Sequence, residues 1–216
     1  MKLNIFVPTE LSDITLGQYQ EYIRVQSQDV DSNYLAQKML EIFCNVKFKD
    51  TRDIKVKDIN AVSEILMDLF EQKPNLITRF KIGKVEYGFI PKLDDMSFGE
   101  LIDADTNISN MDDVHKAMAV LYRPIIGSYG NKYEIEEYNI QDSEIMRLMP
   151  LDAFFSAMLF FYRLGTDLGT TILNYIEEGK KENLVQYLNS QENGDGINQY
   201  ILSLKETLRD LNISLN

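Results

Sequence analysis

The most apolar run of the chain is residues 153–162, AFFSAMLFFY, and it constrains the fold more than any other stretch. Asp152 and Arg163 bound the run. It is well short of the ~18 to 20 apolar residues that a helix needs to span a bilayer, so we do not expect it to cross a membrane. A helix that is apolar around most of its circumference is normally buried. Residues 154–164 are therefore predicted to be the most buried segment of the chain.

The same run has a second interpretation, as a contact surface for another protein. It is apolar on more sides than one buried face requires, and methionine side chains adapt to varied partners. In this interpretation part of the run meets a second chain or a nascent client protein. The candidate contact residues are Phe155, Met158, Phe161 and Tyr162.

Most of the remaining chain shows the spacing of apolar residues that is typical of helices. Two capping boxes, Thr15 with Gln18 and Ser97 with Glu100, predict where two of these helices begin. Pro124 is predicted to break another helix. The predicted helices are 16–25, 34–46, 56–72, 98–104, 111–125 (broken at Pro124), 142–148, 151–179, 181–191 and 197–211.

A β-hairpin is predicted at residues 79–91, where apolar side chains alternate on either side of Gly83-Lys84. A further short strand is predicted at residues 3–8, which Pro8 ends. We expect this strand to pair with the hairpin. The predicted fold class is mainly α (α+β), a helical bundle with a small antiparallel β-sheet formed by the N-terminal strand and residues 79–91. Residues 1–216 are predicted to form a single domain with a helical C-terminal part from about 141.

The two capping boxes lie in stretches that nearly repeat one another. Residues 13–18 read DITLGQ and residues 95–100 read DMSFGE, each a few residues after a predicted strand that ends in proline. One interpretation is that the same capping chemistry arose twice. The other is that two strand-to-helix corners lie side by side in one layer. Neither interpretation places a nucleophile, an acid or a metal ligand, so the repeat indicates a structural role rather than a catalytic or metal-binding one.

The charge balance limits the partners that the chain can have. The sequence has 34 acidic and 22 basic side chains and a net charge of −12. Binding to nucleic acid or to an anionic membrane needs a basic surface, so neither is predicted. An acidic surface suits solubility or a basic partner protein. The opening residues, MKLNIFVPTE, reach a proline and a glutamate before an apolar core develops, so no secretory signal is predicted.

No motif of the sequence predicts a reaction, a cofactor or a metal. Residues 103–113, DADTNISNMDD, partly match a calcium loop, but Ile108 and Val114 replace the glycine and glutamate that such a loop requires. The only histidine, His115, is expected to be a surface or capping residue. The only cysteine, Cys44, is expected to be a buried structural thiol. We therefore expect a protein that is not an enzyme and carries no cofactor.

Arg123, in the sequence LYRPI, is the most distinctive charged residue. One interpretation is a structural ion pair with the acidic residues of 134–137. The alternative is a contact with a partner protein, because arginine is favoured at the centre of protein interfaces.

Four stretches in order, ITLGQYQEY, YGFIPKLDDMSFGELIDAD, HKAMAVLYRPI and MPLDAFFSAMLFFYRLG, resemble small proteins encoded in the structural gene clusters of tailed bacteriophages. The resemblance covers residues 11–165. Some members of this group are described as tail assembly chaperones, others as minor tail or virion proteins. The resemblance carries over no functional residues.

The resemblance implies a non-enzymatic protein that binds an aggregation-prone tail component in the host cytoplasm during assembly. The alternative is a structural virion component, such as a head–tail or tail-barrel subunit, which would form symmetric homo-oligomers. A third class, an enzyme or anti-host factor with an unrecognised active site, is also open. The expected partner is a phage tail or virion protein.

Overall fold

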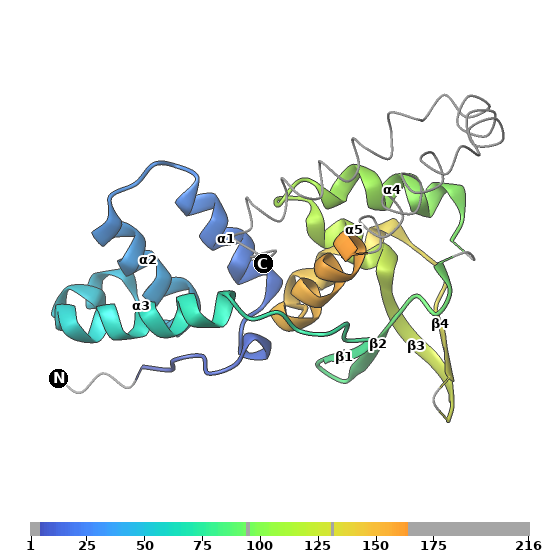
Figure 1. Ribbon diagram of the computed structural model, residues 1–216, viewed down its shortest axis with the longest axis horizontal. Helices are drawn as coiled ribbons and strands as arrows, with labels where there is room; N and C mark the ends of the chain where they lie inside the picture. The colour runs from blue at the N-terminus through green and yellow to red at the C-terminus, as the bar shows by residue number, and fades with distance from the viewer. Residues whose placement is uncertain (1–4, 94–95, 131, 164–216) are drawn as a thin grey trace, which may run out of the picture.

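The computed structural model describes residues 5–93, 96–130 and 132–163 of the chain. Within these residues the protein has a mainly helical α+β fold, as predicted. Three helices gather at one end of the molecule and a β-sheet with two further helices lies at the other (Figure 1). The predicted helices at 181–191 and 197–211, and the part of 151–179 beyond residue 163, lie outside the described residues.

The helical end is built around the aromatic ring of Phe70. The centroid of this ring lies 5.3 Å from that of Tyr19 and 5.4 Å from that of Phe43, both in edge-on contacts. Such contacts between rings add to the stability that apolar burial provides. The three helices that carry these side chains are α1 (Leu16–Gln26), α2 (Ser32–Cys44) and α3 (Val56–Phe70).

The predicted hairpin is present, and it extends into a four-stranded antiparallel sheet. Gly83 adopts a positive φ of 59° in the tight turn, a conformation that glycine reaches without strain. Neighbouring strands follow one another along the chain in the order β1 (Arg79–Ile82), β2 (Val85–Phe89), β3 (Tyr122–Tyr129) and β4 (Lys132–Ile135).

The predicted pairing of residues 3–8 with the hairpin is wrong for the residues that the structure describes. Residues 5–8 form no strand, and β3 takes the place beside β2. Ile5 and Val7 are only partly buried and pack against the core from an extended segment. Alternating apolar residues can thus be buried without joining a sheet, which their pattern alone does not reveal.

The predicted helix at 111–125 divides into a helix and a strand. Helix α5 (Val114–Leu121) ends two residues before Arg123, and β3 begins at Tyr122. Proline disfavours helical geometry in the residue before it, so Arg123 is extended. Pro124 lies opposite Tyr87 of β2, and its carbonyl oxygen accepts the amide of Glu136 at 2.9 Å.

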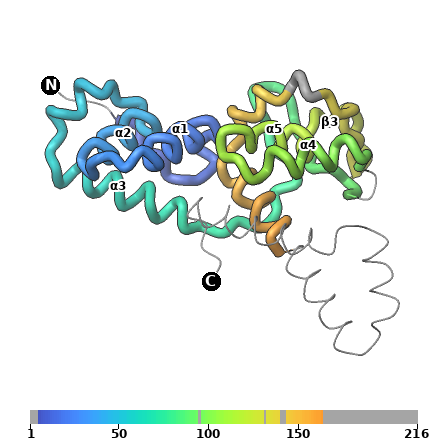
Figure 2. The backbone as a smooth tube through the Cα atoms, turned by 90° about the horizontal axis from the view of Figure 1, so that it is seen from above, coloured from blue at the N-terminus to red at the C-terminus, as the bar shows by residue number. Residues whose placement is uncertain are grey.

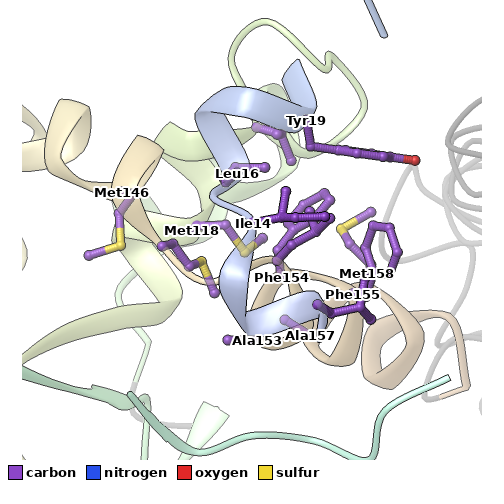
Figure 3. Close-up of a cluster of buried hydrophobic side chains, with 14 of the residues drawn as sticks. Ile14, Leu16, Tyr19, Met118, Met146, Ala153, Phe154, Phe155, Ala157 and Met158 are labelled. Carbon is purple, nitrogen blue, oxygen red and sulfur yellow. The ribbon is translucent and has the colours of Figure 1, made fainter. Parts of the chain in front are cut away.

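The apolar run of residues 153–162 lies at the centre of the molecule, in a helix that spans residues 151–163 of the described chain. Phe154 to Leu159 are buried, as predicted, whereas Phe160, Phe161 and Tyr162 are only partly buried and Leu164 lies outside the described residues. Figures 1 and 2 show this helix between the two ends of the molecule. Figure 3 shows how its side chains meet those of α1 and α5 in one cluster that includes Ile14, Leu16, Tyr19, Met118, Phe154, Phe155 and Met158.

The N-terminal corner is joined to the start of this central helix. Thr15 and Pro150 form an isolated antiparallel bridge. The amide of Leu16 donates to the carbonyl of Met149 at 2.8 Å, and that of Leu151 donates to the carbonyl of Ile14 at 2.9 Å. The first half of the repeated stretch therefore pairs with residues 149–151 and not with the hairpin.

Both capping boxes form as predicted. Gln18 accepts the amide of Thr15 at 2.9 Å, and Glu100 accepts the amide of Ser97 at 2.6 Å. The reciprocal bonds to the two hydroxyls measure 3.2 and 3.3 Å. The second box begins helix α4 (Phe98–Ile108), which packs against α5.

Candidate functional site

Helix α4 carries apolar side chains on two faces. Ala104 and Ile108 are buried on the face toward the protein. On the outer face Phe98 is 78% exposed, Leu101 53% and Ile102 47%. Residues three and four apart share one side of a helix, so these three side chains form a continuous apolar patch, here called the α4 stripe.

Arg123 forms an ion pair at the base of α4. Its Nη1 lies 2.9 Å from Oε1 of Glu100, and the two side chains are 12% and 10% exposed. The partner is therefore Glu100 and not an acidic residue of 134–137. The Nε of Arg123 is buried and has no hydrogen-bond partner among the described residues.

Glu100 is ionised in these surroundings. Burial raises the pKa of its carboxyl group, but the hydrogen bonds from Ser97 and the charge of Arg123 lower it by more. The net result is a pKa below the ordinary value for glutamate. The carboxylate therefore caps the start of α4 and links that helix to strand β3 through Arg123.

A pocket of about 410 Å³ opens beside Arg123. Its lining combines buried apolar or aromatic side chains with the guanidinium of Arg123 and with exposed carboxylates. The buried lining residues include Tyr87, Tyr122 and Met146, and the exposed carboxylates are Glu136, Glu137 and Glu144.

Four polar side chains form a closed hydrogen-bonded circuit near this pocket, here called the polar ring. It consists of Gln20 from α1, His115 from α5, and Glu144 and Arg147 from the 3-10 segment η4 (Ile140–Leu148). Arg147 donates to Gln20 Oε1 and to Glu144 Oε2, each at 2.8 Å. The ring thereby joins three segments that are far apart in the sequence.

The bonds of Gln20 determine the protonation of His115. The amide nitrogen of Gln20 donates to the carbonyl of Met111 at 2.6 Å and to Nδ1 of His115 at 3.2 Å. Nδ1 is therefore an acceptor, and Nε2 carries the proton and donates to Glu144 Oε1 at 3.0 Å. Burial lowers the pKa of His115, an effect that Glu144 only partly offsets, so the imidazole of His115 is neutral.

The prediction that His115 is a surface or capping residue is wrong. Its side chain is 0% exposed, and both ring nitrogens are bonded within the protein. A signal was available in the sequence, because His115 lies in VHKAMAVL, where apolar residues surround it on the helix. Because both nitrogens are bonded within the protein, the imidazole has a structural role and is not placed to act as a general base toward a substrate.

The other predicted contact residues lie along the central helix. Phe155 and Met158 are 0% exposed, so a partner cannot reach them in this conformation. Phe161 and Tyr162 are partly exposed and stay candidates for contact. The thiol of Cys44 is buried, which raises its pKa to about 11.

The partial calcium motif lies mostly within a helix. Asp103, Asp105 and Asn107 belong to α4, where their side chains do not converge as they would in a loop. In the part of the chain that the structure describes, no three His, Cys, Asp or Glu side chains gather closely enough to hold a metal ion. Among the same residues, no helix has the length and apolarity to cross a membrane.

Comparison of the chain with protein-family models, with curated proteins and with solved structures finds no match.

Proposed function

We propose that this chain is a non-enzymatic bacteriophage protein that acts in tail or virion assembly by protein–protein contact, in the manner of a tail assembly chaperone. The α4 stripe is the observation that carries the proposal, because it exposes three large apolar side chains on one helix face. Contiguous exposed apolar groups are typical of surfaces that bind other proteins. The stripe suits the apolar face of a helix in a tail component.

The charge of the chain specifies the partner further. The net charge is −12, and three exposed carboxylates line the pocket beside Arg123. Opposite charges speed association and disfavour wrong partners. We therefore expect the partner segment to carry lysine or arginine beside its apolar residues. Such a contact would take place in the host cytoplasm, where tail components are made.

The alternative is a structural virion component, such as a head–tail or tail-barrel subunit. The exposed tip of the β3–β4 hairpin favours it, since Ile126 is 62% and Tyr129 71% exposed. Strand β4 is also an edge of the sheet among the described residues. Neighbouring subunits in a ring can pair through such edges.

Quantitative mass spectrometry of purified virions and of infected-cell lysate tests these two roles. A chaperone should be abundant in the lysate and absent from virions. Stoichiometric presence in virions contradicts the chaperone role and supports the structural one. Absence of any phage from the source contradicts both.

A pair of double variants tests the α4 stripe. Leu101→Gln with Ile102→Gln removes apolar surface and keeps good helix formers. From infected cells, the tagged variant should recover about tenfold less of a phage tail or virion protein than the unaltered chain.

The matched control is Ile65→Gln with Met67→Gln on α3, where both side chains are 43% exposed. Residues two apart do not share a helix face, so this pair forms no stripe. The control should recover the partner normally. Equal losses in both double variants, or a loss in neither, would contradict a role for the stripe.

A further inference from the structure

The polar ring lies where the two ends of the molecule meet. Gln20 belongs to the helical end, whereas His115 belongs to α5 at the sheet end; Figure 2 shows α1 and α5 as neighbours. Gln20 is 1% exposed and the His115 side chain 0%. Water therefore cannot replace a bond that this contact loses unless the two elements separate.

The donor and acceptor roles around the ring follow from Arg147. Arg147 can only donate, so it requires the oxygen of Gln20. The nitrogen of Gln20 then faces the carbonyl of Met111 and Nδ1 of His115. Rotating the amide by half a turn would place its nitrogen against Arg147 and its oxygen against a carbonyl.

A proton on Nδ1 therefore has no place in the closed ring. It would set two N–H donors against each other across 3.2 Å, between His115 and Gln20. The carboxylate of Glu144 would attract an imidazolium, but its side chain is 69% exposed, so the surrounding water screens that attraction. The closed ring accepts His115 only in its neutral form.

We propose that the polar ring is a proton-sensitive junction, which joins α1 to α5 and η4 at neutral pH and opens when His115 is protonated.

The other charged groups around His115 do not provide an alternative site for the proton. On its own helix, Lys116 is paired with Asp113 at 2.7 Å. Beside the ring, Asp112 is paired with Arg24 at 2.6 Å. The hydrogen bond from Lys116 lowers the pKa of Asp113, which moves it further from the pH range in which histidine titrates.

The elements packed on α5 add no further group that titrates near neutral pH. Of the buried residues of α4, Glu100 is the only titratable one, and it is held by Ser97 and Arg123. From η4, Glu144 and Arg147 are the charged members of the ring itself. Strand β3 joins α5 through Tyr122, a tyrosine whose pKa burial raises further from neutrality.

Hydrogen exchange of the full chain, followed by mass spectrometry, tests the junction. Protection factors, which correct for the intrinsic effect of pH, are compared at pH ~7.5 and pH ~5.5, on either side of the ordinary histidine pKa of about 6.5. Protection in α1 and α5 should fall about tenfold, since the open state binds the proton and the closed state does not. Protection in α3 should not change.

Two variants identify the side chain that takes up the proton. In His115→Gln the fall in protection of α1 and α5 between the two pH values should disappear. In Glu144→Gln it should stay about tenfold, because the closed ring takes up no proton on His115 whether or not the side chain at position 144 is charged. The second variant alters an exposed side chain, so it remains informative if the first does not fold.

Three results would overturn the proposal: an unchanged fall in His115→Gln, disappearance of the fall in Glu144→Gln, which would assign the proton to that carboxylate, or an equal loss of protection in α3. The last would mean that acid unfolds the whole protein rather than opening the junction.

Discussion

At the scale of single residues, the carboxylate of Glu100 has two partners. One oxygen accepts the amide of Ser97 and completes the capping box of α4. The other pairs with the guanidinium of Arg123. Because both charged side chains are nearly buried, water cannot take the place of either partner.

Glu100→Gln keeps an acceptor for the cap but removes the charge that faces Arg123. We expect it to lower the free energy of unfolding by about 2 kcal/mol, because a buried guanidinium is left without its counter-charge. Urea unfolding followed by circular dichroism measures the change. Asp113→Asn, which breaks a more exposed pair with Lys116, should cost less than about 1 kcal/mol. Equal costs would mean that burial does not strengthen the pair.

The same carboxylate predicts a pH dependence. Burial raises its pKa, but Ser97 and Arg123 lower it by more, so the folded value lies below that of the unfolded chain. The unfolded chain then binds more protons as the pH falls below about 4.5, and stability is lost on further acidification through the folded pKa. The stability difference between the unaltered protein and Glu100→Gln should therefore shrink between about pH 6 and about pH 3. A constant difference would contradict this linkage.

At the scale of helices, α1 and α4 begin alike but have different surroundings. Gly17 and Gly99 hold the same position, two residues after the capping Thr15 or Ser97. A Cβ added at Gly17 would lie 3.0 Å from the carbonyl oxygen of Arg147. A Cβ added at Gly99 would meet no atom within 4 Å.

These surroundings predict opposite effects for the same substitution. Gly17→Ala should destabilise the protein by about 1 to 3 kcal/mol, because the methyl group pushes against the backbone of η4. Gly99→Ala should stabilise it by about 0.5 kcal/mol, because alanine loses less freedom in a helix. Thermal unfolding of the two variants measures both. If Gly17→Ala is also stabilising, η4 can move away from α1 at little cost.

Elements with local signals were the predictable ones. The capping boxes depend on residues three positions apart, and the hairpin depends on alternation about one turn, so both were found. Strand β3 was missed, because its proline and glycine hide the alternation of YRPIIGSY. The pairing of Arg123 with Glu100 and the hydrogen-bond partners of His115 depend on contacts between distant segments. Neither spacing nor composition encodes such contacts.

At the scale of the whole molecule, one buried apolar cluster reaches from Leu11 to Leu159. The central helix contacts both ends. The ring of Phe155 lies 5.2 Å from that of Tyr19 in α1, and the ring of Phe160 lies 5.7 Å from that of Phe89 in β2. Loss of packing in this helix should therefore affect both ends together.

Phe155→Ala should lower the free energy of unfolding by about 4 kcal/mol, because it opens a cavity in the core. Hydrogen exchange should show α3 and β2 losing protection to the same extent. The matched control is Phe98→Ala, which truncates a phenylalanine that is 78% exposed and should change stability by less than about 0.5 kcal/mol. Unequal losses in α3 and β2 would contradict the single domain predicted for residues 1–216.

The bridge between Thr15 and Pro150 also has a consequence for the order of events during synthesis. A ribosome adds ~5 to 20 residues per second, so roughly 7 to 30 seconds separate the two halves of this bridge. During that interval α1 has left the ribosome without the segment that covers Leu16. The nascent chain is then itself an apolar client for chaperones, until residues 149–151 emerge and close the fold.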